Sequence, residues 1–214
     1  MSTEFWTYLS ALVVGISGFY YAIRAWQGSI FPNPVSWGVW SVVGVALFLA
    51  ADSSKAEAVY WSTLVGAWNP TMIAGVILWR SRSKVYGLQK HEKQCLALAA
   101  VGYFFWFLVH DLPEVAPWSM YFMIAVDLFA LWPTWVQIYR DPLSDKPFPW
   151  IIFGWGFGLS GFAIEVNTLA NWALPMYMFI GSNFVALPMI IGRIRRKVPL
   201  AQWVGKCRHL MENR

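Results

Sequence analysis

Charged residues are scarce in this chain. Of its 214 residues, 13% are charged and 58% are hydrophobic, whereas a soluble domain carries about 25% charged residues. So few charges could not cover the surface of a soluble globule of this size, which excludes an ordinary soluble enzyme. The abundance of apolar residues excludes a disordered chain. The composition therefore predicts a membrane protein, with room for about eight spans of about 20 residues each.

Residues that bind metals or form disulfides are also few. The two cysteines, Cys95 and Cys207, give neither a disulfide framework nor a zinc spacing. The three histidines, His91, His110 and His209, are too few, and their contexts too polar, for a bis-histidine haem in a membrane. The sequence contains no hydrolytic triad and no phosphate-binding loop, so we expect no enzyme activity and no cofactor. The basic residues lie between apolar runs, so nucleic acid is not an expected partner.

Seven apolar segments follow one another along the chain, separated by short polar stretches. They cover Phe5–Ala25, Val35–Ala51, Ala58–Trp79, Cys95–Val109, Trp118–Tyr139, Trp150–Val166 and Trp172–Gly192. With so little sequence between them, these segments predict seven transmembrane helices, because a helix satisfies its backbone polar groups within one span. We therefore expect an all-α protein that is integral to the plasma (inner) membrane, with the lipid bilayer as a partner.

The basic residues predict the orientation of these spans. With the N-terminus outside, every one of the 16 Lys and Arg residues except Lys55 lies on the cytoplasmic side. Most of them lie in the stretch 80–93 and in the tail after residue 192. By the positive-inside rule, the N-terminus is then outside and the C-terminus cytoplasmic. Six or eight spans would break this alternation.

An internal repeat relates the first three segments to the last three. An offset of 115 residues aligns them without a gap and pairs Trp40 with Trp155, Gly66 with Gly181, Arg80 with Arg195, and Pro32 and Pro34 with Pro147 and Pro149. Because one segment lies between two sets of three, both sets have the same orientation, as in a parallel repeat. We expect a first three-helix repeat over 1–82, a linker helix with its loops over 83–117, a second three-helix repeat over 118–197, and a cytoplasmic amphipathic tail over 198–214.

A 3+1+3 chain of seven helices with this orientation resembles the SWEET/PQ-loop superfamily of small-solute transporters. The nearest counterpart of its proline–glutamine signature is Pro133 with Gln137, in the fifth segment. The resemblance covers essentially all of the apolar segments. It implies alternating-access transport of a small polar solute such as a sugar, with proton coupling left open. Nicotinamide-riboside transporters, which share a related fold and many tryptophans, stay open as a variant. The alternative function is a non-transporting receptor or assembly partner with the same central pocket, and self-association is also left open.

Polar side chains in the middle of apolar segments are costly and often functional. Asn69 and Asn183 lie midway along the third and seventh segments, and the resemblance implies sugar binding by an asparagine from each of these spans. An interhelical hydrogen bond is the structural alternative. Trp68, next to Asn69, could stack on the solute. Trp40 and Trp155, which match across the repeat, could line or close the pathway on its inner side.

Asp127 is the single acid near the middle of an apolar segment. A carboxylate at that depth is costly, and no basic residue lies at a similar depth to pair with it. Asp127 is therefore the candidate for carrying a proton or binding a cation. The alternative is a protonated, hydrogen-bonded aspartic acid with a structural role.

Two further expectations concern prolines within apolar segments and tryptophans at segment ends. Pro70 and Pro133 lie inside the third and fifth segments. A proline removes a backbone hydrogen bond and permits bending, so both are hinge candidates. Tryptophans at segment ends, Trp150 among them, are expected in the interfacial belt.

Overall fold

The computed structural model describes residues 2–30, 32, 34–81, 90–112 and 114–204. Its helices are α1 (Thr3–Trp26), α2 (Pro34–Ser53), α3 (Tyr60–Ser81), α4 (Lys90–Val109), α5 (Ala116–Arg140), α6 (Pro147–Ser160), α7 (Leu169–Arg195) and α8 (Leu200–Val204). Short 3₁₀ turns, Glu57–Val59 and Gly161–Ala163, precede α3 and follow α6. Across the described ranges there is no strand, so the expected all-α class is confirmed.

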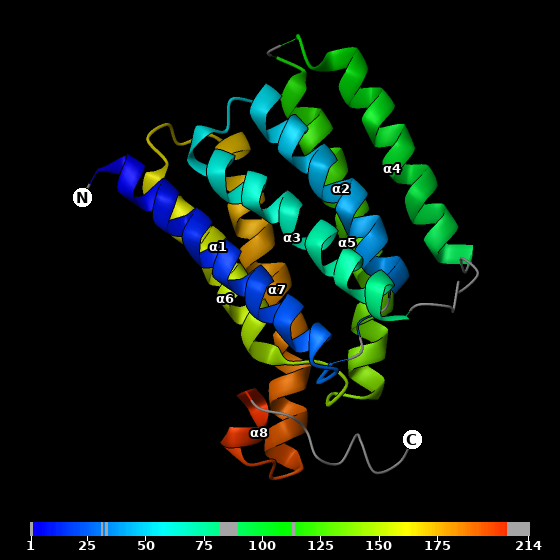
Figure 1. The fold of residues 1–214 in the computed structure, drawn as a ribbon. Helices are drawn as coiled ribbons and strands as arrows, with labels where there is room; N and C mark the ends of the chain where they lie inside the picture. Colours follow the sequence, from blue (N-terminus) through cyan, green and yellow to red (C-terminus); the bar gives the residue numbers. More distant parts are fainter. Residues whose placement is uncertain (1, 31, 33, 82–89, 113, 205–214) are drawn as a thin grey trace.

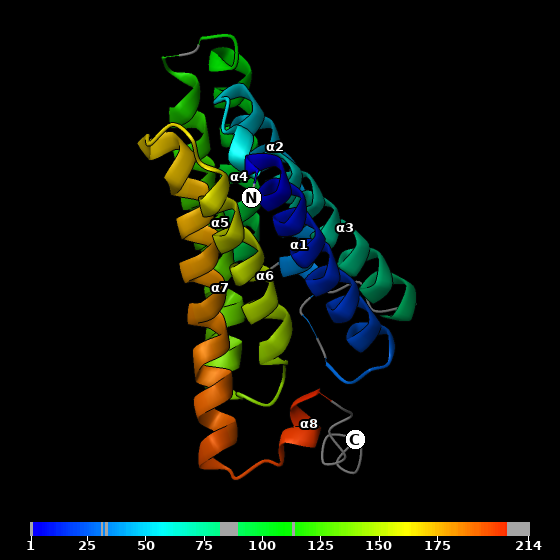
Figure 2. The same ribbon diagram turned by 90° about the vertical axis from the view of Figure 1, so that its left-hand side faces the viewer.

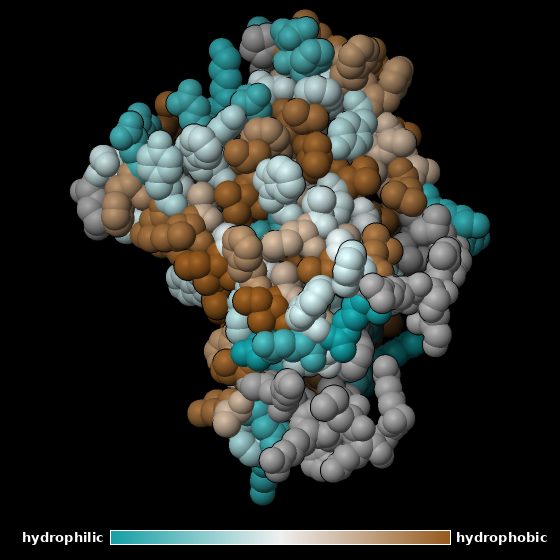
Figure 3. All heavy atoms as spheres, in the orientation of Figure 1, coloured by the Kyte–Doolittle hydropathy of each residue, from teal (hydrophilic) through white to brown (hydrophobic). Residues whose placement is uncertain are grey.

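Four helices are long and apolar enough to cross a membrane. They are α1, α2 from Ser36 onward, α5 and α7, and α4 contains a shorter apolar stretch, Lys93–Val109. This finding agrees with a membrane protein, while the count of seven spans stays a prediction. Apolar side chains gather over the middle of the face in Figure 3, and hydrophilic side chains lie toward its two ends. Phe19, Phe104 and Trp132 are among the large hydrophobic side chains that are more than half exposed, as expected for contact with lipid.

The sixth apolar segment differs from its predicted bounds. It was expected over Trp150–Val166, but α6 begins at Pro147 and ends at Ser160. Pro147 and Pro149 lie in the first turn, where a helix loses nothing by lacking an N–H donor. Gly161 follows the last residue of α6, and the backbone is extended by Ile164. Glycine has a low helix propensity, which favours the end of the helix there.

Six helices pack in a closed ring. α1 packs against α3 and α6, α2 against α3 and α5, and α7 against α5 and α6. The order around the ring is therefore α1, α3, α2, α5, α7, α6. Helix α4 lies outside the ring, against α2 and α5 (Figure 1). The view in Figure 2 separates α1 and α3 from α5 and α7, on the two sides of the molecule.

Glycines allow the helices of the ring to approach closely. A Cβ atom at Gly156 of α6 would lie 2.7 Å from Cγ2 of Val14 in α1 and 2.9 Å from the Val14 backbone nitrogen. A Cβ atom at Gly44 of α2 would lie 3.2 Å from Cα of Ala67 in α3. Small residues of this kind let helix backbones pack closely against one another.

Candidate functional site

A cavity of about 100 Å³ lies inside the six-helix ring. Every helix of the ring contributes to its lining, for example Gly18 from α1, Leu47 from α2, Leu131 from α5 and Phe153 from α6. Within the described part of the chain, α4 contributes no lining residue. The cavity therefore lies between the group α1–α3 and the group α5–α7, and residues of both groups line it.

The central helix of each group presents equivalent residues to the cavity. The 115-residue offset pairs lining residues of α3 with lining residues of α7: Thr63 with Met178, Gly66 with Gly181, and Ala67 with Ser182. Positions i, i+3 and i+4 lie on one face of a helix, so α3 and α7 turn the same face inward. The glycine in each set leaves room for the cavity.

Four aromatic rings form one wall of the cavity. This aromatic cluster consists of Tyr21, Trp37, Trp40 and Trp150, which all line the cavity. Ring centroids lie 4.6 Å apart for Tyr21 and Trp37, 5.2 Å for Trp37 and Trp40, and 5.8 Å for Trp40 and Trp150. The cluster lies where α1 ends and where α2 and α6 begin. Trp150, expected in the interfacial belt, is instead part of this internal wall.

A buried carboxylate holds two rings of the aromatic cluster. Oδ2 of Asp145, in the loop between α5 and α6, accepts hydrogen bonds from Tyr21 Oη at 2.9 Å and from Trp150 Nε1 at 3.1 Å. Its Oδ1 accepts from the backbone N–H of Lys146 at 2.6 Å. Burial raises the pKa of Asp145, while these hydrogen bonds and the charge of Arg193 act in the opposite direction. The tyrosine and the tryptophan belong to different halves of the ring, so Asp145 joins the two halves.

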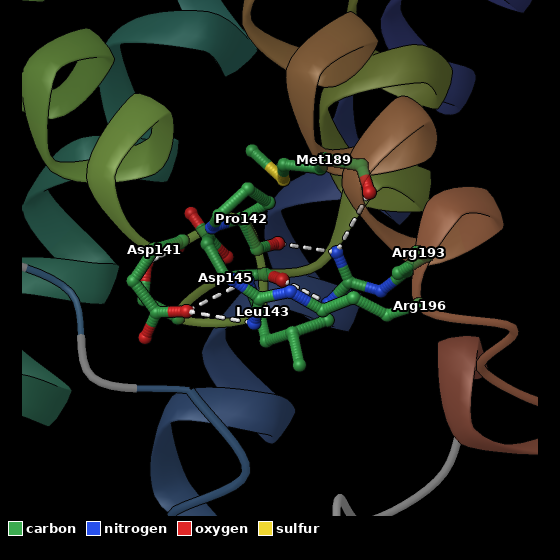
Figure 4. Close-up of polar contacts among 8 residues, drawn as sticks. Asp141, Pro142, Leu143, Asp145, Met189, Arg193 and Arg196 are labelled. Atoms are coloured by element: carbon green, nitrogen blue, oxygen red, sulfur yellow. Dashed lines mark hydrogen bonds and ion pairs between the residues drawn. The ribbon is translucent and has the colours of Figure 1, made fainter.

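Arg193 fixes the loop that carries Asp145. Its side chain is fully buried in the last turn of α7. Nη2 donates to the backbone oxygen of Asp145 at 2.5 Å, and Nη1 donates to that of Pro142 at 2.6 Å. Figure 4 shows the guanidinium reaching from α7 into this loop, beside the partly exposed pair Asp141 and Arg196, whose charged atoms lie 3.8 Å apart.

An arginine also donates to backbone oxygens in the other half of the ring. Arg80, in the last turn of α3, donates to the backbone oxygens of Ala25 and Trp26 at the end of α1. The 115-residue offset pairs Arg80 with Arg195, which is exposed. The arginine that serves the same purpose in α7 is therefore Arg193, two residues earlier.

Helix α8 packs beneath the same loop. Lys146 Nζ donates to the backbone oxygen of Gln202 at 2.6 Å, and the rings of Phe148 and Trp203 have centroids 6.3 Å apart. Of the amphipathic tail expected over 198–214, the structure describes the part up to Val204. Residues 205–214 lie outside the described residues.

Asp127 lines the cavity together with a tyrosine from α7. Tyr177 Oη donates a hydrogen bond to Asp127 Oδ2 at 2.5 Å, and both residues line the cavity. The proposed role of Asp127 as a proton or cation site stays a prediction. The sequence did not single out Tyr177. The available signal for Tyr177 was a hydroxyl group within the last apolar segment. The sequence did not show that this hydroxyl bonds to Asp127, because the two residues lie 50 positions apart along the chain.

Asn69 and Asn183 lie differently with respect to the cavity, and their proposed role in solute binding stays a prediction. Asn69 is buried and lines the cavity, and its Nδ2 donates to the backbone oxygen of Val14 at 2.9 Å. Asn183 Nδ2 donates to the backbone oxygen of Phe179 in its own helix at 2.7 Å, and Asn183 is not a lining residue. The offset pairs Asn183 with Trp68, not with Asn69.

Some of the candidate tryptophans and prolines line the cavity, and the others lie outside its lining. Trp40 and Pro70 line the cavity. Trp68 is 67% exposed and Trp155 is 55% exposed, and both point away from it. Trp155 lies two residues after the lining residue Phe153, which is about 200° around α6. Pro133 lies inside α5 but outside the lining.

No protein-family model, no curated protein and no solved structure matches the chain. Among the residues that the structure describes, no group of three or more His, Cys, Asp and Glu could hold a metal ion. The candidate site is therefore defined by its geometry alone. It consists of the cavity, the aromatic cluster with Asp145, and the pair of Asp127 and Tyr177.

Proposed function

We propose that this protein is a membrane transporter that moves a small polar solute through the central cavity by alternating access. The position of the cavity is the observation that carries this proposal. It lies between two groups of three helices, and all six helices line it. Rocking one group against the other around a fixed site would expose the cavity first on one side of the membrane and then on the other.

In this proposal α1–α7 all cross the bilayer as a 3+1+3 parallel repeat, with α4 as the linker. The symmetry of the ring supports the repeat, because exchanging α1 with α5 and α2 with α6 exchanges the α1–α6 contact with the α2–α5 contact. The paired lining residues of α3 and α7 support it as well. On the same basis we propose membership of the SWEET/PQ-loop superfamily.

The aromatic cluster is the inner gate in this mechanism. Arg24, Arg80, Arg140 and Arg193 lie in the last turns of α1, α3, α5 and α7, so the positive-inside rule assigns this end to the cytoplasm. To open there, α1 and α2 must move away from α6. That movement separates the Trp150 indole from the other aromatic side chains and breaks the hydrogen bond between Tyr21 and Asp145. Pro70 and Pro133 allow α3 and α5 to bend.

The proposal is tested by solute flux into liposomes that contain the purified protein, with a panel of sugars, amino acids, nucleosides and small amines. We expect at least one of these solutes to cross faster than in protein-free liposomes. Gly66→Leu should reduce that flux to background, because Gly66 lines the cavity and a Cβ atom there would already lie 3.1 Å from the Phe157 ring.

Gly75→Leu is the matched control, since it places the same side chain on the same helix where nothing lies within 4 Å of a Cβ atom. Its flux should equal that of the wild type. If no solute in the panel crosses, the transporter proposal fails and the receptor alternative replaces it. Equal flux through both glycine variants would show that the cavity is not the pathway.

A further inference from the structure

One acidic side chain and no basic side chain line the cavity among the described residues. Asp127 is its one acidic lining residue, and the lining residues of the described chain include no Lys, Arg or His. Asp127 Oδ2 accepts the hydrogen bond from Tyr177. Its Oδ1 accepts no hydrogen bond from the described residues, so it is free to face a ligand. A carboxylate in an apolar cavity attracts a cation and disfavours an anion.

The aromatic cluster adds a second attraction for a cation. Tyr21, Trp37, Trp40 and Trp150 line the same cavity as Asp127. The face of a Trp or Tyr ring attracts an organic cation that lies within about 6 Å of the ring centroid. Several such rings around one space are the usual means of binding alkylated ammonium groups.

Hydrogen-bond donors in the cavity are largely engaged by the protein. Ser17 Oγ donates to the backbone oxygen of Pro149 at 3.0 Å, Thr63 Oγ1 to that of Val59 at 2.7 Å, and Asn69 Nδ2 to that of Val14 at 2.9 Å. A sugar would need several such donors for its hydroxyl groups, and unmatched polar groups are costly to bury. Alkyl groups need none, and much of the remaining lining is apolar.

These features lead us to infer that the solute is a small organic cation, such as a quaternary ammonium or a protonated alkylamine. Asp127 would supply the opposite charge, and the aromatic cluster would contact the alkyl groups. The inference narrows the solute class of the proposed transporter and rests on that proposal for movement across the membrane. Binding of the cation is a separate property and is measurable without transport.

The test compares choline with 3,3-dimethylbutan-1-ol, an uncharged molecule of nearly the same shape with carbon in place of nitrogen. Binding to the detergent-purified protein is followed by intrinsic tryptophan fluorescence and by the melting temperature. We expect choline to change both signals saturably, and the alcohol to bind roughly tenfold or more weakly. Equal binding of the two molecules, or no binding of choline, would overturn the inference.

Variants identify the site of binding. Asp127→Asn should weaken choline binding roughly tenfold or more, whereas Asp52→Asn, the same change at an exposed acid outside the cavity, should leave it unaltered. If Asp127→Asn does not fold, Trp40→Leu provides the second test and should also weaken choline binding. Choline binding that survives the cavity substitutions would overturn the assignment of the site.

The binding and flux measurements distinguish failure of the cation inference from failure of the transport proposal. Choline binding without flux of any solute would contradict transport and leave the cation site standing. Flux of a neutral sugar or nucleoside, together with no choline binding, would contradict the cation inference and leave transport standing.

Discussion

Replacing Arg193 with leucine should lower the free energy of unfolding by about 3–5 kcal/mol, because it removes two buried hydrogen bonds from a charged donor, each worth about 1.5–3 kcal/mol. The guanidinium is fully buried and donates to the backbone oxygens of Pro142 and Asp145. Its positive charge also offsets the burial of the Asp145 carboxylate. Arg193→Leu removes both contributions at once. Thermal unfolding in detergent, followed by scanning fluorimetry, measures the loss.

Arg195→Leu is the control for this prediction. Arg195 lies one half-turn further along the same helix and is exposed, so its replacement should change the melting temperature little. The 115-residue offset pairs Arg195 with Arg80, and a sequence comparison alone would therefore choose Arg195 as the structural arginine. Equal losses in the two variants would contradict the role assigned to Arg193.

Replacing Asp127 with asparagine should remove the response of solute flux to a pH gradient. An amide keeps the shape of the side chain and can still accept the hydrogen bond from Tyr177, but it carries neither a proton nor a negative charge. Proton coupling requires that a proton and the solute cation occupy this carboxylate in turn, so the amide ends their exchange. The measurement is flux into liposomes with and without an imposed pH gradient.

Tyr177→Phe separates the carboxylate from its hydrogen bond. It removes the donor at 2.5 Å but retains the carboxylate, so its flux should still respond to the pH gradient. A wild-type flux that ignores the gradient, and that Asp127→Asn leaves unchanged, would contradict proton coupling without affecting the transport proposal itself.

The sequence was informative about composition, segment positions and depth. The charge deficit predicted membrane-type helices, and Asp127, Asn69 and Trp40, chosen for their depth or their place in the repeat, line the cavity. The depth of a residue within an apolar segment follows from the hydropathy of the residues around it, which a single sequence shows directly. The 115-residue offset also pairs positions of α3 and α7 that lie on equivalent cavity faces.

Helix rotation and loop contacts could not be predicted in the same way. Asn69 lines the cavity, whereas its partner at the 115-residue offset, Phe184, is exposed, and Asn183 bonds within its own helix. Trp155 matches Trp40 in the alignment, yet α6 presents a different face inward. Asp145 is 124 residues from Tyr21 along the chain, and no local pattern marks two such residues as partners. These contacts depend on how the two halves pack together.

Accessibility of one cavity residue from each side of the membrane tests alternating access most directly, because it needs no knowledge of the solute. Ser182→Cys, in a protein with Cys95 and Cys207 replaced by serine, puts a single thiol on the cavity wall. Phe184→Cys, on the exposed outer face of α7, is the control. Its thiol should react from neither side, because a lipid-facing thiol does not form the reactive thiolate. Alternating access predicts that a membrane-impermeant thiol reagent labels Ser182→Cys from either side. Labelling from one side only would contradict the account and indicate a pocket that never changes sides.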